Sequence, residues 1–299
     1  MVGISNLFRM KFIHEIQHAG WSAPFDAATQ NEATEALESG LVLFFPKIAF
    51  ALSDKEAELR SPRVIDKSKN VNYNPATGRI GGTICAGEEA ATLTQMMSRF
   101  ASQTKALLGG ILPRYGADLI QARTSFRPVE VAGRNSSWRK DDTRLHVDAF
   151  PASPTGGKRI LRIFSNVNPE RPRTWRVGEP FEDMARRFFP KLTRPLPGSA
   201  TFNYLLRITR APRSEYDHYM LQLHDRMKED TDYQQTVTQH TQPFPAGSTW
   251  VVFSDQVSHA AMSGQHQFEQ TYLLPLRGML QPETSPVRVL ERLAGRKLA

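Results

Sequence analysis

The first third of the chain has the hydrophobic patterns of helices and of one strand. Residues 31–38 are rich in helix-forming residues, and Gly40 follows them as glycine often follows a helix. The next segment, 41–45, is an apolar run of strand length. Residues 88–108 place apolar side chains at helical spacing, and the two glycines after them are expected to end that helix. The pattern therefore predicts a mixed α/β segment over 1–125.

Prolines and glycines interrupt the chain at short intervals from residue 126 onward. Short apolar runs lie between them, and the clearest is 249–253, Thr-Trp-Val-Val-Phe. Closely spaced short strands separated by such turn residues are typical of antiparallel sandwiches and barrels. We therefore predict a mainly β fold with flanking helices and an N-terminal helical cover.

No repeat, low-complexity tract or flexible linker divides the chain, so we predict a single domain over 1–299. Within it, 1–125 would support a β core over 126–280, and 281–299 would form a C-terminal helix. A polar link, 132–137, would lead into the core. The composition, with 40% hydrophobic and 23% charged residues, is ordinary for a globular protein.

The cellular compartment is suggested by the single cysteine and by the N-terminus. Cys85 lies in an apolar stretch and has no partner for an intramolecular disulfide, so we expect a buried thiol in a reducing, intracellular setting. The first 13 residues lack the features of a signal peptide. The most apolar stretch, 41–45, is far shorter than the roughly 20 residues that a membrane helix needs. These features predict a soluble, cytoplasmic protein.

The charge balance predicts an anionic partner. The net charge is +8 and the isoelectric point is near 9.7. Nucleic acid, a membrane surface, or a phosphorylated or carboxylated substrate would each satisfy such a surface. Charge alone does not choose among them.

The strongest chemical motif is His146-Val147-Asp148, combined with the distant His259 just beyond the apolar run 249–253. In a strand, residues i and i+2 project from the same face, so one strand can present an imidazole and a carboxylate to one ion. A second strand would supply the other imidazole. This donor set is the 2-His-1-carboxylate triad of non-haem Fe(II) oxygenases, which leaves positions open for a co-substrate and dioxygen. His218 and His224 are alternative third ligands, and His259 could instead be a hydrogen-bonded core residue.

A second metal motif lies near the N-terminus. Residues 14–18, His-Glu-Ile-Gln-His, match the H-E-x-x-H motif of zinc hydrolases, in which two histidines one helical turn apart bind zinc and the glutamate activates water. Gly20 and Pro24 would end any such helix within about two turns. We therefore favour an amphipathic N-terminal helix with solvated histidines, and keep a zinc-dependent hydrolase using His14, Glu15 and His18 as an alternative.

Longer stretches carry a resemblance to a known family. The Pro-x-Gly-x-strand-His layout of 245–259 resembles the distal half of the double-stranded β-helix of 2-oxoglutarate-dependent oxygenases. Residues 137–151, 174–181 and 247–270 resemble the bacterial Kdo hydroxylases, which hydroxylate carbon 3 of the 3-deoxy-D-manno-oct-2-ulosonic acid (Kdo) of the lipid A inner core. The resemblance runs from about residue 126 to the C-terminus. It implies a jelly-roll or cupin-like core and a lipopolysaccharide-modifying dioxygenase with Fe(II), 2-oxoglutarate and O2, in which His146, Asp148 and His259 bind the metal.

An oxygenase of this class must also bind the far carboxylate of 2-oxoglutarate, usually with a fixed arginine or lysine. Many members place that cation shortly after the distal histidine, where this sequence has glutamines and a histidine, and Arg277 lies too far along. The asparaginyl-hydroxylase and JmjC-like branch places it on the strand after His-x-Asp. Arg162 is at that position here and is our first choice, with Arg127 and Arg159 next. An exposed strand arginine is the ordinary alternative.

The implied substrate agrees with the charge. Kdo-lipid A is polyanionic, so a basic protein could dock on the cytoplasmic face of the inner membrane, with no nucleic-acid partner. Arg139, Lys140 and Arg144 flank the metal motif and could bind the sugar acid, and Trp138 could pack on its apolar face. Solvated charges and a core tryptophan are the ordinary alternatives. A non-catalytic protein that binds anionic glycolipid or nucleic acid on a cupin-like fold is a further hypothesis.

Overall fold

The computed structural model describes residues 11–134 and 136–299. Residues 1–10, which are most of the segment on which the expectation about a signal peptide rests, and Asn135 of the predicted polar link lie outside these residues. In the described part of the chain, no helix is long and apolar enough to cross a membrane.

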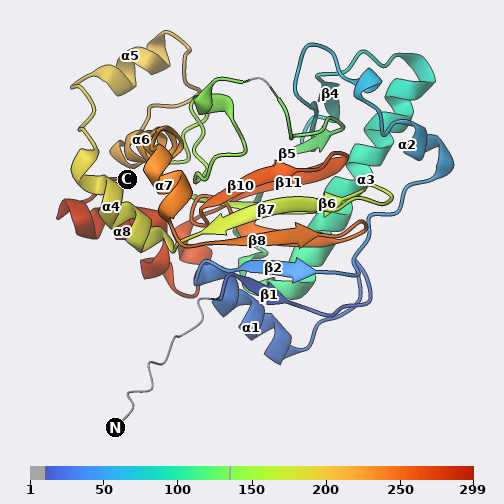
Figure 1. The fold of residues 1–299 in the computed structure, drawn as a ribbon, viewed down its shortest axis with the longest axis horizontal. Coiled ribbons are helices and arrows are strands. Elements are labelled where there is room, and N and C mark those ends of the chain that lie inside the picture. The colour runs from blue at the N-terminus through green and yellow to red at the C-terminus, as the bar shows by residue number, and fades with distance from the viewer. Residues whose placement is uncertain (1–10, 135) are drawn as a thin grey trace.

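The described strands form two sheets that lie one against the other (Figure 1). The large sheet has the strand order β1-β2-β9-β6-β11-β5-β3-β4 and the small sheet the order β10-β7-β8. Strands β1 and β2 are parallel, whereas the other pairs are antiparallel. The large sheet comprises β1 (Ile13–Glu15), β2 (Val42–Phe45), β3 (Val71–Asn74), β4 (Arg79–Gly81), β5 (Ile120–Arg127), β6 (Arg159–Asn166), β9 (Thr249–Phe253) and β11 (Gln267–Leu274), and the small sheet β7 (Arg173–Gly178), β8 (Gln239–Phe244) and β10 (His259–Ser263).

Helices cover the outer face of the large sheet and one end of the molecule. Helices α1 and α3 pack on the large sheet, while α4, α6, α7 and α8 gather at the end where β7 meets β8, on the left in Figure 1. The helices are α1 (Ala27–Glu38), α2 (Asp54–Glu58), α3 (Gly87–Ile111), α4 (Phe181–Phe188), α5 (Ser199–Leu205), α6 (Glu215–Glu229), α7 (Thr231–Thr236) and α8 (Pro286–Ala294).

The central strands are buried on both faces. Leu43 of β2 and Val251 of β9 pack toward α1 and α3, whereas Phe44 and Trp250 face the small sheet. Successive side chains of a strand alternate between faces, so covering both faces buries every residue of β9. This explains why 249–253 is a continuous apolar run. The two sheets face each other without closing into a barrel, and the predicted mainly β fold with flanking helices is confirmed.

Helix α3 runs further than its sequence pattern predicts. The prediction that Gly109 and Gly110 end it is wrong, because the helix continues to Ile111 and ends just before Pro113. A glycine costs only about 1 kcal/mol within a helix, whereas proline removes a backbone donor and restricts the residue before it. The absence of a side chain at Gly110 lets the Phe25 ring approach, since an ideal Cβ there would lie 3.3 Å from that ring.

The N-terminal His-Glu-x-x-His motif begins in a short strand and does not form a helix, so the prediction of an amphipathic helix is wrong. His14 is on β1, which pairs with β2, and His18 lies beyond the end of the strand. The His18 ring stacks on Phe25 with centroids 3.6 Å apart, and its Nε2 lies 3.1 Å from the Ala23 carbonyl oxygen. The two histidines therefore do not share a helical turn, and the geometry of a zinc hydrolase site is not formed.

Residues between β7 and β8 form helices rather than the closely spaced strands that the turn residues suggested. Helices α4 to α7 occupy this segment. Ser214 and Asp217 form a capping box at the start of α6, a local signal that the sequence analysis did not use. Helices α4, α6, α7 and α8 bury a second core, which we call the helical core. Cys85, expected to be buried, is partly exposed.

Candidate metal centre

His146 and Asp148 lie on an extended segment that makes one isolated β-bridge, rather than on the predicted strand. The backbone N–H of His146 donates to the His259 carbonyl at 3.0 Å, and that of His259 donates to the His146 carbonyl at 2.9 Å. Leu145 and Val147 are buried in the helical core. Because alternate residues of an extended chain point to opposite sides, His146 and Asp148 both face away from that core.

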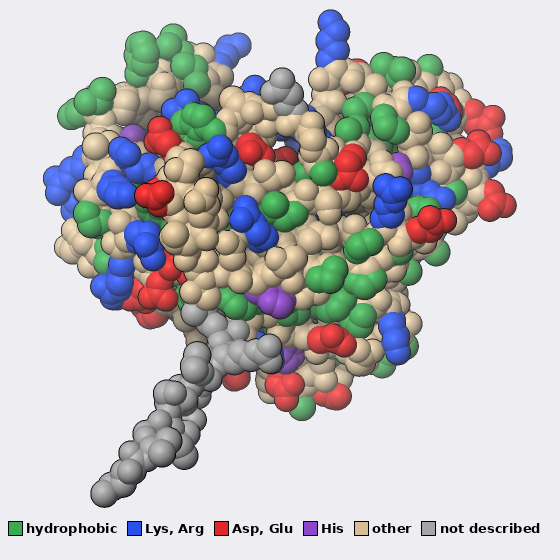
Figure 2. All heavy atoms as spheres, viewed as in Figure 1, with side chains coloured by type: hydrophobic (Ala, Val, Ile, Leu, Met, Phe, Trp, Pro, Cys, Tyr) green, Lys and Arg blue, Asp and Glu red, His purple; other side chains and the backbone are tan. Residues whose placement is uncertain are grey.

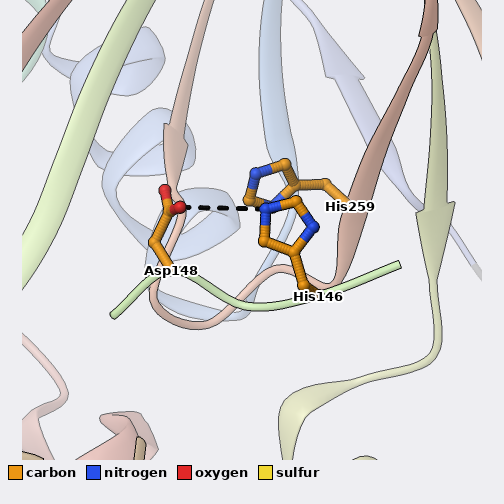
Figure 3. Close-up of side chains that lie close together, drawn as sticks. All are labelled: His146, Asp148 and His259. Atoms are coloured by element: carbon orange, nitrogen blue, oxygen red, sulfur yellow. Dashed lines mark ion pairs between the residues drawn. The ribbon is translucent and has the colours of Figure 1, made fainter. Parts of the chain in front are cut away.

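Three side chains converge at this point (Figure 3). His146, Asp148 and His259 each offer one ligand atom, and these atoms lie within 4.8 Å of one another. The His146 Nε2 is 3.9 Å from the Asp148 Oδ1. Among the residues that the structure describes, no other group of three or more His, Cys, Asp or Glu side chains is arranged in this way. The structure thus brings together the three residues that the sequence singles out.

Hydrogen bonds orient both imidazole rings. The Nδ1 atom of His146 lies 2.8 Å from the Arg144 carbonyl oxygen, and that of His259 lies 2.8 Å from the Val257 carbonyl oxygen. A carbonyl oxygen only accepts, so each Nδ1 carries the proton and each Nε2 keeps a free lone pair. Burial lowers the pKa of both histidines, which favours the neutral form. Neutral imidazoles with a free Nε2 are the state in which histidine binds a metal ion.

Asp148 is held as a carboxylate. Burial opposes ionisation, but the neighbouring Arg162 and the two histidines bring the pKa of Asp148 well below its usual range. Its buried Oδ2 is 3.2 Å from the Arg162 Nε, yet it has no aligned hydrogen bond within the described part of the chain. Two imidazole nitrogens and one carboxylate oxygen in this state fit a divalent ion such as Fe(II).

The alternative third ligands are placed differently. His224 on α6 lies near the cluster, with its ring centroid 5.2 Å from that of His146, but its Nδ1 contacts Asp225 at 3.0 Å. The Nε2 of His218, also on α6, lies 3.0 Å from the Thr193 carbonyl oxygen. Neither histidine belongs to the group of converging ligand atoms.

A cavity of about 230 Å³ opens beside the cluster and is strongly basic. Phe164, Trp175 and Ala261 supply apolar wall, and the Trp175 ring stacks on His259 with centroids 4.9 Å apart. Cations outnumber carboxylates among the lining residues, the cations being Lys69, Arg127, Arg139, Lys140, Arg162, Arg173 and Lys228 and the carboxylates Asp142, Asp148 and Glu269.

Comparison with known proteins agrees with this geometry. A sequence model of the family described as "3-deoxy-D-manno-oct-2-ulosonic acid (Kdo) hydroxylase" matches residues 20–297. The chain belongs to the Kdo hydroxylase family. No match was found among curated proteins.

Solved structures of one Kdo hydroxylase, KdoO, are similar over nearly the whole chain. KdoO in complex with alphaketoglutarate (2-oxoglutarate) and Fe(III) is 47% identical, with a TM-score of 0.94 and coverage of 97% of this chain and 98% of that chain. The complex with succinate and Fe(III) is 48% identical, with a TM-score of 0.93 and coverage of 96% and 97%. KdoO is described as a non-heme Fe(II) alphaketoglutarate dependent dioxygenase. The oxygenase fold predicted for this chain is confirmed.

Two of the three candidate arginines lie on opposite faces of β6. Arg162 is on the same face as Phe164 and lines the cavity, whereas Arg159 is on the same face as Leu161 and points away from the cavity. There Arg159 is fully buried, and its Nε and one Nη form hydrogen bonds with Asp255 at 2.8 and 3.2 Å. Its role is therefore structural, and the structure does not support it as a ligand of the co-substrate.

Arg162 and Arg127 share a carboxylate that the sequence analysis missed. Glu269 on β11 is 3.2 Å from the Arg162 Nη1 and 2.9 Å from the Arg127 Nη2. It lies in the region after His259 where many oxygenases place a cation. The two guanidinium groups on β6 and β5 thus stand on either side of one buried carboxylate. The alternation of side chains along β11, which places Gln267 and Glu269 on the same face, is the sequence signal that could have identified Glu269.

The candidate substrate ligands divide into two groups. Arg139 and Lys140, in a short 3-10 turn, line the cavity, and the Arg139 guanidinium stacks 4.2 Å above the Trp138 ring. Arg144 is not among the lining residues, because its Nη1 donates to the Lys228 carbonyl oxygen at 2.7 Å and its Nε pairs with Asp141. Trp138 is thus a support for Arg139 and not part of the cavity wall.

Two further cations in the cavity come from distant elements. Arg173 on β7 and Lys228 on α6 are both almost fully buried. Burial lowers the pKa of each, and the nearby Arg127 and Arg134 add to this effect at Arg173. Among the described residues their side chains donate only to carbonyl oxygens, of Gly264 and Arg139 respectively. Buried cations without a carboxylate partner favour an anionic ligand. No local motif marks these two residues.

Proposed function

We propose that this chain is an Fe(II)- and 2-oxoglutarate-dependent dioxygenase that hydroxylates Kdo. The observation that carries the proposal is the convergence of His146, Asp148 and His259 in a member of the Kdo hydroxylase family. The structures of KdoO with alphaketoglutarate, succinate and Fe(III) support the same cofactors here.

His146, Asp148 and His259 would hold the iron, which when bound supplies the oxidising chemistry with 2-oxoglutarate and dioxygen. The carbonyl groups of Arg144 and Val257 fix the two rings so that both Nε2 atoms face Asp148. Arg162 would bind the far carboxylate of 2-oxoglutarate. Its side chain is 12% exposed in the cavity wall, so a charge-assisted pair there would be largely shielded from water. The apolar ring of Trp175 helps to exclude water beside His259.

The surplus of cations supports an acidic sugar as substrate. Kdo carries a carboxylate, and Arg173 and Lys228 are buried cations without a carboxylate partner in the described structure. We propose that they bind the sugar acid while Arg139 and Lys140 contact more exposed anionic groups of Kdo-lipid A. Hydroxylation at carbon 3, and peripheral contact with the cytoplasmic face of the inner membrane, are part of this proposal.

The direct test is conversion of 2-oxoglutarate to succinate in air with Fe(II), with and without Kdo2-lipid A. We expect succinate to form faster with the lipid, together with a mass increase on Kdo equal to one oxygen atom. Efficient oxidation of a peptide or nucleobase, with no oxidation of Kdo, would contradict the substrate proposal but not the oxygenase assignment. Ligand binding without turnover, or a zinc-dependent hydrolysis, would contradict both.

Neutralising Arg139 and Lys140 should impair substrate use selectively. The double variant Arg139→Gln/Lys140→Gln is expected to raise the KM for Kdo2-lipid A by about tenfold, because exposed ion pairs contribute up to about 1 kcal/mol each. The difference in KM between this variant and the unmodified protein should become smaller as added salt screens the two charges.

The charge-matched control is Arg79→Gln/Lys105→Gln, which removes two exposed cations away from this cavity. It should leave this KM unchanged. Equal effects of the two double variants would show that only net charge matters. A rise in the 2-oxoglutarate requirement instead would place Arg139 or Lys140 at the co-substrate.

A further inference from the structure

One exposed segment outside the metal centre combines apolar and basic side chains. Residues 191–213, between α4 and α6, contain no aspartate or glutamate but five cations. Its exposed large apolar side chains are Leu196 (78%), Phe202 (61%), Tyr204 (46%), Leu205 (72%), Leu206 (56%) and Ile208 (55%). We call residues 194–210 the α5 surface.

Helix α5 at the centre of this surface buries none of its residues. Figure 2 shows hydrophobic side chains gathered at the upper left, over the position of α5 in Figure 1, with Lys or Arg beside them. Across the described residues, only Ile84, Ile120 and Leu280 are other large apolar side chains with comparable exposure. Apolar side chains concentrated in this way mark an interaction surface rather than the scattered exposure of an ordinary protein surface.

The α5 surface is attached to the segment that carries Asp148. The backbone N–H of Arg210 donates to the Ala152 carbonyl at 2.9 Å, and the Arg213 guanidinium donates to the Pro151 carbonyl at 2.9 Å. The chain then enters α6, which carries the cavity residue Lys228. What binds to the α5 surface is therefore held at a defined position relative to the catalytic cavity.

The charges on this surface identify its partner. Arg194, Arg207 and Arg210 are exposed, and the salt bridges of the described residues involve none of them. A second copy of this chain, meeting the same surface about a two-fold axis, would bring these arginines together and be repelled. A bilayer with anionic headgroups instead offers negative charge at the level of the arginines and hydrocarbon beneath it.

We propose that the α5 surface is an interfacial membrane anchor, which inserts Phe202, Leu205 and Leu206 at the headgroup boundary of an anionic bilayer. Arg194, Arg207 and Arg210 contact the lipid headgroups. Helix α5, with seven residues, lies in the interface, since a membrane span needs about 20. This inference rests on the proposed function and deepens it. A lipid-linked sugar lies in a membrane, so an enzyme that oxidises it must bind at the membrane surface for the sugar to reach the cavity.

The test is sedimentation of the full chain with vesicles of phosphatidylethanolamine and phosphatidylglycerol, without iron, 2-oxoglutarate or Kdo. The variant Phe202→Ser/Leu205→Ser/Leu206→Ser should lower the vesicle-bound fraction relative to free protein by at least about tenfold. The matched control Ile84→Ser/Ile120→Ser/Leu280→Ser removes exposed apolar side chains elsewhere and should bind as the unmodified protein does. Arg194→Gln/Arg207→Gln/Arg210→Gln should weaken binding and reduce its dependence on salt.

Equal binding by the α5 triple variant and the unmodified protein would overturn the proposal. So would a failure of the unmodified protein to bind these vesicles, or α5-dependent self-association in its place. Turnover of a water-soluble, deacylated Kdo substrate distinguishes this proposal from the proposed function. The α5 triple variant should retain that turnover. If the unmodified protein binds vesicles but oxidises no form of Kdo, the membrane anchor is supported and the proposed function is rejected.

Discussion

Replacing His259 by alanine is expected to abolish stable iron binding and to lower turnover by more than about 100-fold. Groups that only orient a metal ligand typically contribute about 10- to 100-fold, so removing a ligand itself should cost more. The His259 Nε2 is free because its Nδ1 is bound to the Val257 carbonyl at 2.8 Å, and among the described residues no imidazole besides those of His146 and His259 joins the converging group. Iron stoichiometry after desalting and the rate of succinate formation measure the two effects.

The matched control for this prediction is His224→Ala. His224 lines the same cavity, and its ring lies 5.2 Å from that of His146, yet it does not belong to the converging group. Its variant should keep iron. Loss of iron from His224→Ala with retention in His259→Ala would assign the third ligand to α6. Circular dichroism and thermal unfolding would establish that both variants are folded.

Replacing Arg162 by alanine is expected to raise the concentration of 2-oxoglutarate needed for half-maximal rate by two or more orders of magnitude. A charge-assisted pair in a shielded pocket typically contributes about 1.5–3 kcal/mol, and a bidentate pair reaches the upper part of that range. Arg162→Lys should recover only part of the loss, because lysine keeps the charge but not the planar pair of donors. Steady-state kinetics with varied 2-oxoglutarate tests this expectation.

Iron binding must be followed in the same variants, because Arg162 also lies 3.2 Å from Asp148. A raised requirement with iron retained supports a role at the co-substrate, whereas loss of iron alone would make Arg162 a support for Asp148. Arg127→Ala tests the second arginine beside Glu269, and a larger effect there would transfer the role to Arg127. Arg277→Ala should have no effect, since Arg277 is exposed and pairs with Asp118.

Local geometry in this protein follows from the sequence wherever a pattern acts over a few residues. The apolar run 249–253 becomes β9, and residues 41–45 contain β2, because each is buried on both faces. His146 and Asp148 face the same way because alternation belongs to any extended backbone, even where only a single bridge forms. The residue types of the metal cluster could therefore be inferred before the structure.

The faces of the sheet and the partners of each strand depend on contacts between distant residues. Periodicity shows that Arg159 and Arg162 point to opposite sides of β6, but only the packed sheet shows which side holds the cavity. The same holds for Glu269 and Arg173, which reach the cavity from strands far apart in the chain.

Helical signals were likewise overridden or hidden by tertiary context. Residues 14–18 match a helical zinc motif, but pairing of β1 with β2 draws their first residues into a strand. The helices α4, α6 and α7 are stabilised by a shared helical core rather than by uninterrupted local patterns. The sequence determined which residues can bind a metal and how neighbours alternate, because these are local properties. Long-range burial decided which of them meet, since its free energy exceeds the small preferences of individual segments.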